Sequence, residues 1–123
     1  MPHILIKGPV AIEDIWLAFQ PMEFVEDGSR MKAEEAYLSH DKNELLVRST
    51  VVEREIPKNF FVKFIAKDDD RIMVCLESIV YAERTEPVKR LLGIYVWKIM
   101  QAEPQVEVIK TNIEHYIRAQ ASA

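Results

Sequence analysis

FFVKFIAKDDDRIMVCLESIVY, residues 60–81, is the stretch that decides the fold. Two apolar runs, 60–67 and 71–81, flank three consecutive aspartates, a pattern typical of an antiparallel β-hairpin. The second run is apolar on both of its faces, and Glu77 is its only charged residue after Arg71. An antiparallel sheet with one wet face should alternate apolar and polar residues instead. We therefore expect helices, a curled sheet or another subunit to cover both faces of this hairpin.

Strand-like periodicity continues upstream of the hairpin. The stretches 23–26 and 30–39 flank the turn signal Asp27-Gly28-Ser29, residues 45–52 alternate, and Pro57 and Asn59 indicate a break. Residues 3–10 predict a short first strand, and residues 11–20 predict a short amphipathic helix. Consecutive strands joined by short polar turns favour an antiparallel meander of four to five strands.

The remainder of the chain predicts helix. Thr85 suits an N-cap and Pro87 a first helical turn, followed by apolar residues at helical spacing up to Met100. Pro104 interrupts this pattern, and a second helical segment is predicted to run to about residue 119, giving a long broken C-terminal helix. We expect a single α+β domain over residues 1–123, in either a helix-grip-like or a hot-dog-like arrangement.

Composition limits the classes of function. The 123 residues are 49% hydrophobic and 29% charged, as in an ordinary soluble globular protein. The net charge of −4 argues against nucleic acid as a partner, because it leaves no broad basic surface. The apolar runs are far shorter than the roughly 20 residues of a membrane span. A single cysteine excludes an internal disulfide, and we expect the protein to be cytoplasmic.

The candidate reactive residues lack the spacing of known catalytic or metal motifs. The three histidines lie on a predicted strand, turn and helix without metal-ligand spacing, so we expect no metal. Cys75 lies in the middle of an apolar strand, where burial should raise its pKa and keep it inert. The sequence has no nucleophile elbow, P-loop or dinucleotide fingerprint, so we expect no cofactor and assign no catalytic residue.

Carboxylates offer one candidate. Glu34 and Glu35 are adjacent, so in a regular strand they face opposite sides and cannot line one site. Glu77 shares a predicted face with Cys75 and would be desolvated there, which suits acid–base chemistry or ligand anchoring. The other interpretation is that Glu77 pairs with Arg48 or Lys63 from a neighbouring strand.

The helix over 85–100 carries the second candidate surface. Trp97 falls on its polar side with Lys89 and Arg90, one turn from Gly93, whose missing side chain leaves a dent. This group could contact a protein partner, an anionic ligand or a membrane surface. Alternatively, the helix is buried on most sides and Trp97 packs under the second helix.

Two functions fit these patterns. The preferred hypothesis is a small non-enzymatic binding or assembly domain that self-associates and holds a small apolar ligand. The alternative is an enzyme acting on an acyl or other hydrophobic substrate through a pocket carboxylate, Glu77 or Glu35. The excess of apolar surface favours a homodimer, with the C-terminal helix or the 60–81 hairpin at its interface.

Overall fold

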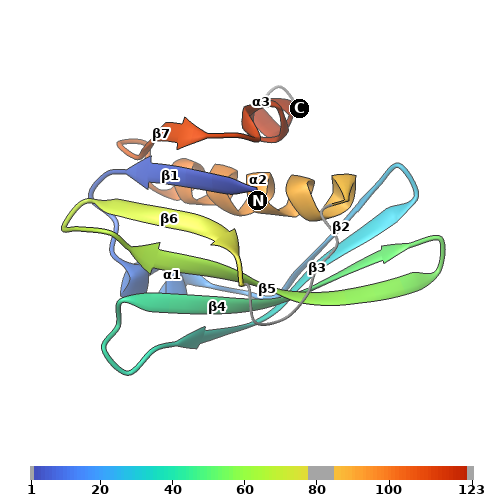
Figure 1. The fold of residues 1–123 in the computed structure, drawn as a ribbon, viewed down its shortest axis with the longest axis horizontal. Coiled ribbons are helices and arrows are strands. Elements are labelled where there is room, and N and C mark those ends of the chain that lie inside the picture. The colour runs from blue at the N-terminus through green and yellow to red at the C-terminus, as the bar shows by residue number, and fades with distance from the viewer. Residues whose placement is uncertain (1, 78–84, 122–123) are drawn as a thin grey trace.

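A curled antiparallel sheet and one long helix dominate the computed structural model, which describes residues 2–77 and 85–121 (Figure 1). The sheet has seven strands in the order β2-β3-β4-β5-β6-β1-β7. The elements, in chain order, are β1 (His3–Lys7), α1 (Ile12–Ala18), β2 (Met22–Glu26), β3 (Ser29–Leu38), β4 (Glu44–Glu53), β5 (Ile56–Ala66), β6 (Arg71–Leu76), α2 (Glu86–Ala102), β7 (Glu107–Thr111) and α3 (Glu114–Ala121). No helix among them combines the length and apolar character needed to cross a membrane.

Two of the hairpin turns follow the local sequence signals, and a third does not. β2 and β3 meet at Asp27 and Gly28, whose positive φ angles of 51° and 79° close the turn. The aspartate run separates β5 from β6 as predicted. The predicted break at Pro57 and Asn59 is wrong, because β5 already begins at Ile56 and both residues pair with β4. The chain reverses direction before them, at Arg54 and Glu55, whose φ angles are 52° and 67°. Neither is a glycine or an asparagine, the residues that most readily adopt positive φ.

The segment after Pro104 corrects the predicted helix and the predicted strand count. Glu107–Thr111 forms β7, which pairs antiparallel with β1, while β1 also pairs with β6. β1 would otherwise present an open edge, and β7 satisfies its backbone groups on that side. Of the apolar positions in this segment, Ile109 lies in β7 and Tyr116 and Ile117 lie in the shorter helix α3, while Val106 and Ile113 precede these two elements. The broken C-terminal helix is therefore α2, a strand and α3, and the sheet has more strands than the four to five predicted.

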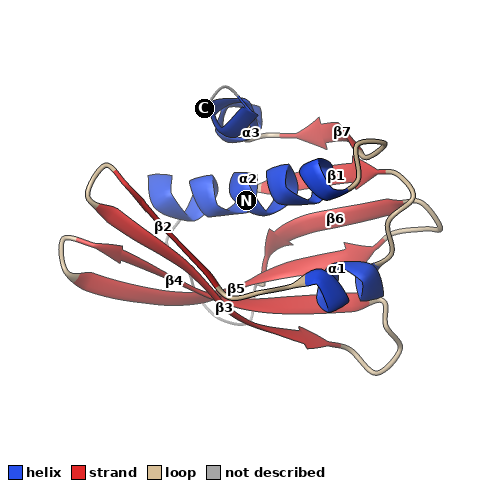
Figure 2. Ribbon diagram, turned by 180° about the vertical axis from the view of Figure 1, so that it is seen from behind, coloured by secondary structure: helices blue, strands red, loops and turns tan. Residues whose placement is uncertain are grey.

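The core lies between α2 and the concave side of the sheet (Figures 1 and 2). Ile72, Val74 and Leu76 of β6 point into it and are 0–5% exposed. Met73 and Cys75 on the other face are only half-buried, so the expected full cover of both faces is not present in the described chain. The part of the predicted strand beyond Glu77 lies outside the described residues.

Helix α3 packs directly against α2 at Gly93. A Cβ atom at position 93 would lie 2.9 Å from both the carbonyl carbon and the carbonyl oxygen of Tyr116. The Tyr116 hydroxyl donates a hydrogen bond to Glu86 Oε2 at 2.5 Å, joining the two helices a second time. The dent predicted at Gly93 therefore exists and is filled by the backbone of α3.

Gly93→Ala should destabilise the protein by about 1–3 kcal/mol, because the added methyl group overlaps backbone atoms of α3. An unobstructed glycine-to-alanine change inside a helix would instead stabilise it, by about 1 kcal/mol. Urea denaturation followed by circular dichroism measures the change. Gln101→Ala, on the exposed side of α2, serves as a control and should stay within about 0.5 kcal/mol of wild type. A more stable Gly93→Ala protein would contradict the packing of α3 on α2.

Candidate functional site

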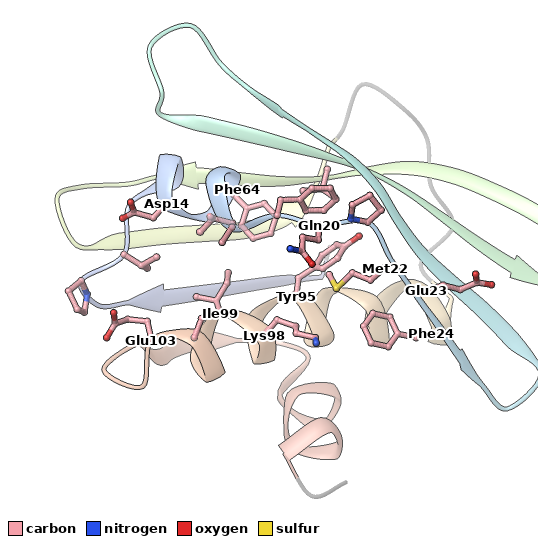
Figure 3. A pocket seen from close by; sticks show the side chains of 18 residues that line it. Asp14, Gln20, Met22, Glu23, Phe24, Phe64, Tyr95, Lys98, Ile99 and Glu103 are labelled. Atoms are coloured by element: carbon pink, nitrogen blue, oxygen red, sulfur yellow. The ribbon is translucent and has the colours of Figure 1, made fainter.

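A cavity of about 700 Å³ lies between α1, the segment leading into β2, the sheet and the second half of α2 (Figure 3). This volume is within the range of small-molecule sites. Most of its lining is apolar: Val10, Ile15, Phe19, Met22, Phe24, Val47, Phe64 and Ile99. The other lining residues include Gln20, Tyr95 and four charged side chains, Asp14, Glu23, Lys98 and Glu103.

Helix α1 forms a thin wall of this cavity. It has seven residues, of which only Ile12 is buried. Asp14 Oδ2 accepts a hydrogen bond from the Ala11 backbone N–H at 3.1 Å, which fixes the helix start. Ile15 faces the cavity, whereas Leu17 is 67% exposed on the outside. Because Ile12 is the only fully buried residue of α1, burial of apolar side chains contributes little to holding this wall in place.

One face of α2 forms the opposite wall. Tyr95, Lys98, Ile99 and Ala102 all line the cavity, at the spacing i, i+3, i+4 and i+7. This spacing places them on one side of a helix, so Lys98 interrupts an otherwise largely apolar stripe. Sequence reasoning assigned Lys98 no role, although a lysine within an apolar stripe is the signal that could have identified it.

A buried pair of hydroxyl groups adjoins the cavity. The Tyr95 hydroxyl and Ser49 Oγ are 2.8 Å apart, and Ser49 Oγ also donates to the Val47 carbonyl at 3.1 Å. Tyr95 is 5% exposed, and burial raises the pKa of its hydroxyl, while the hydrogen bond with Ser49 opposes the shift. The hydroxyl is therefore neutral at physiological pH, and it donates to Ser49 Oγ, because the single Ser49 hydroxyl proton goes to the Val47 carbonyl.

The surface predicted around Trp97 is divided in the structure. Gly93 contacts α3, and Arg90 pairs with Asp27 at 3.4 Å and Glu26 at 3.8 Å in the β2–β3 hairpin. Lys89 and Trp97 are half-buried. The Trp97 ring lies 5.9 Å from Nζ of Lys98, a residue that lines the cavity.

Glu77 lies away from the cavity, on the convex face of the sheet. Its carboxylate is 3.2 Å from Lys63 Nζ, which is one of the two partners that the sequence suggested. The hydrogen bond with Glu77 raises the pKa of Lys63, so this lysine stays charged. Cys75 is directly opposite Lys63 in the sheet register and is half-buried, a weaker burial than the sequence predicted.

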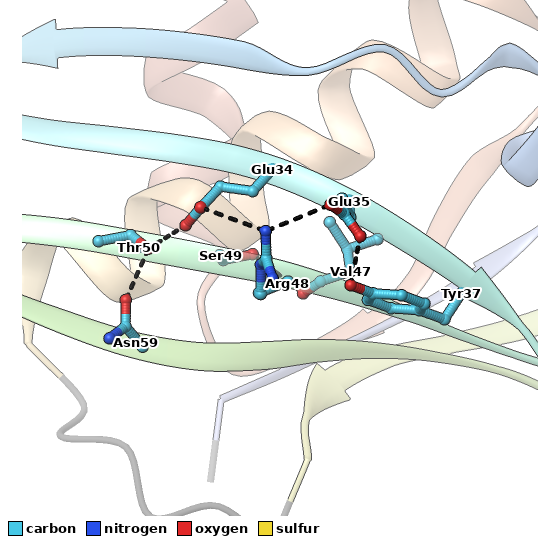
Figure 4. Close-up of polar contacts among 8 residues, drawn as sticks. All are labelled: Glu34, Glu35, Tyr37, Val47, Arg48, Ser49, Thr50 and Asn59. Carbon is cyan, nitrogen blue, oxygen red and sulfur yellow. Dashed lines mark hydrogen bonds and ion pairs between the residues drawn. The ribbon is translucent and has the colours of Figure 1, made fainter.

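The adjacent residues Glu34 and Glu35 both reach Arg48, which corrects the expectation that they face opposite sides (Figure 4). Nη2 of Arg48 is 3.7 Å from Glu34 Oε2 and 3.4 Å from Glu35 Oε1. A register shift between Ala33 and Glu35 inserts one extra residue in β3, and such a bulge turns consecutive side chains to one side. Glu35 also accepts a hydrogen bond from the Tyr37 hydroxyl.

The three histidines do not assemble with other ligand types. Among residues 2–77 and 85–121, no group of three or more His, Cys, Asp or Glu side chains could hold a metal ion. Comparisons with protein-family models, curated proteins and solved structures gave no match to this chain. The candidate site therefore rests on the cavity itself.

Cys75 should react slowly with iodoacetamide in the folded protein. Burial raises its pKa above the ordinary value, so at pH 8 it has less reactive thiolate than an unfolded cysteine. We expect alkylation of the folded protein to be several-fold slower than alkylation in denaturant. The difference between the two rates should narrow as the pH rises past the pKa of Cys75 in the folded protein. The positive charge of Lys63 lowers this pKa, so Lys63→Met should slow the reaction further and Lys63→Arg should not. Mass spectrometry of timed samples gives the rates; equal native and denatured rates would contradict the burial.

Proposed function

We propose that this protein binds a small apolar ligand in the cavity between α1 and α2. The observation that carries the proposal is the cavity of about 700 Å³ with its largely apolar lining. Filling such a space with ligand removes apolar surface from water on both sides, at roughly 25 cal/mol per Å². Of the two arrangements considered from the sequence, a cavity between a curled sheet and its central helix supports the helix-grip-like one.

The enzyme alternative has weaker support. Glu77 and Glu35, the carboxylates suggested for it, are not among the residues that line the cavity. Both instead face the other side of the sheet and contact cations there. The Tyr95–Ser49 pair is neutral and suits hydrogen bonding to a ligand better than proton abstraction. These positions favour binding over catalysis.

Ala18→Trp should abolish binding by filling the cavity from the α1 side. N-phenyl-1-naphthylamine, a neutral apolar dye, should gain fluorescence with the wild-type protein and bind at least about tenfold more weakly to the variant. Leu17→Trp adds the same ring to the exposed side of α1 and should leave dye binding unchanged. Circular dichroism checks that both variants fold. Equal dye binding to wild type and Ala18→Trp would exclude this cavity as the site.

Self-association is a second part of the proposed function, and the convex side of the sheet supports it. Half-buried apolar side chains, called here the outer face, lie on its central strands: Leu5, Leu46, Phe61, Ile65 and Met73. Ion pairs of Lys63 with Glu77 and of Arg48 with Glu35 place both charge signs beside them. A two-fold interface between identical surfaces needs such a self-complementary mixture.

Helix α2, the other candidate for the dimer interface, has little apolar surface left for a second copy. Leu91, Leu92 and Val96 of α2 are fully buried within one chain, and Tyr95 and Ile99 line the cavity. The 60–81 hairpin therefore remains the better candidate for contact between two copies, through its outer face.

The wild-type protein should sediment as a dimer, at about twice its 14.3 kDa mass, at high micromolar concentration. Charged residues at the centre of the outer face, in the double variant Phe61→Lys and Ile65→Lys, should give monomer. Val25→Lys and Ile109→Lys change exposed apolar residues elsewhere and should remain dimeric. Sedimentation equilibrium distinguishes these states, and a wild-type monomer would refute self-association through this face.

A further inference from the structure

Lys98 is a cation in the lining of the proposed binding cavity. It extends from the cavity face of α2, and its Nζ lies 5.9 Å from the centroid of the Phe24 ring (Figure 3). The same atom is 5.9 Å from the centroid of the Trp97 ring. Among the residues that the structure describes, no carboxylate lies within ion-pair distance of Lys98. Lys98 is exposed, and among the described residues its ammonium group lies beside the rings of Phe24 and Trp97 and is hydrated.

None of the described carboxylates that line the cavity forms an ion pair with Lys98. Asp14 accepts the Ala11 backbone N–H at 3.1 Å, and Glu23 lies 3.9 Å from Nη1 of Arg30. Glu103 ends α2, and Figure 3 shows it with Asp14 at one end of the cavity, while the Lys98 ammonium group points toward the other. One end of the cavity thus carries the carboxylates Asp14 and Glu103. The other end carries the Lys98 ammonium group together with Glu23, whose carboxylate is paired with Arg30, and apolar side chains lie between the two ends (Figure 3).

The geometry points to a monocarboxylate with an apolar tail as the ligand, its carboxylate on Lys98 Nζ; this inference rests on the proposed function. The tail would lie along Ile99 toward Phe64, where the lining is apolar. A charge-assisted hydrogen bond to the ammonium group holds the carboxylate at the mouth, where the oxygens not bound to lysine stay hydrated. One lysine with no arginine or glycine-rich loop in the described lining suits a single negative charge better than a phosphate dianion.

The chemical class is tested with three ligands that share one ten-carbon tail: decanoate, decanol and decyltrimethylammonium. Each is titrated into the wild-type protein with bound N-phenyl-1-naphthylamine, and its affinity is read from displacement of the dye. Decanoate should bind most tightly. Lys98→Met, which keeps the length of the side chain, should weaken decanoate binding about tenfold and leave decanol unchanged. Lys98→Arg should restore decanoate binding, because the positive charge returns.

Lys110→Met is the matched control, because it removes the same charge from an exposed position on β7 outside the cavity lining. It should leave decanoate affinity within about twofold of wild type, since charges beyond about 8–10 Å are largely screened in physiological salt. The emission of Trp97, measured in a Trp16→Phe background, should also change with decanoate and not with decanol, because Lys98 adjoins its ring.

Three results would overturn the assignment while leaving the cavity as a binding site. In the first, Lys98→Met weakens the affinities for decanoate and decanol equally. In the second, decyltrimethylammonium binds more tightly than decanoate. In the third, decanol displaces the dye and decanoate does not. Failure of the proposed function has a different signature. In that case the dye would not bind, or Ala18→Trp would not remove its site.

Discussion

Helix α2 is apolar around most of its circumference, and covering it is the constraint on which the rest of the structure depends. Nine of its residues are buried, from Pro87 to Ile99. A flat sheet covers one side of a helix only, so the sheet must curl and a further element must cover what remains. α3 provides that cover, and Gly93 allows its backbone to approach α2 closely.

The path of the chain follows from this constraint. β1 lies between β6 and β7, so strands from the two ends of the sequence pair in one sheet. β7 extends the curl beyond β1 and leads directly into α3. The close approach of Gly8 to Val106, where an added Cβ would meet the Val106 backbone at 2.7 Å, joins the chain after β1 to the chain before β7.

The cover is incomplete over the second half of α2, and the cavity is the consequence. There the opposing element is α1, whose seven residues contribute only Ile12 to the core. Tyr95 and Ile99 are buried yet line this space, and Lys98 between them is exposed. Lys98 can occupy an apolar stripe because its ammonium group reaches the mouth of this space, while its methylene groups lie along the wall. The proposed carboxylate site thus lies where the packing stops.

The convex side of the sheet has a different chemistry. Its apolar side chains are half-buried rather than covered, and ion pairs such as Lys63–Glu77 lie between them. The two proposed activities therefore lie on opposite sides of the sheet, ligand binding on the concave side and self-association on the convex side. Removing one should therefore leave the other intact.

Local sequence determined the β2–β3 and β5–β6 hairpins, α1 and α2, because alternation, the Asp27-Gly28 turn and the apolar spacing of α2 each act over a few residues. Only the tertiary structure decided that Glu107–Thr111 is a strand, since its partner β1 lies about a hundred residues away and local periodicity cannot register that edge. The same holds for the bulge that brings Glu34 and Glu35 to Arg48. Gly93 and Arg90, which the sequence placed on the polar side of α2 as contacts for a partner, each contact another element of the same chain. Lys98 became a candidate site residue only because α1 covers that face of α2 incompletely, and the extent of that cover depends on the three-dimensional packing of the whole chain.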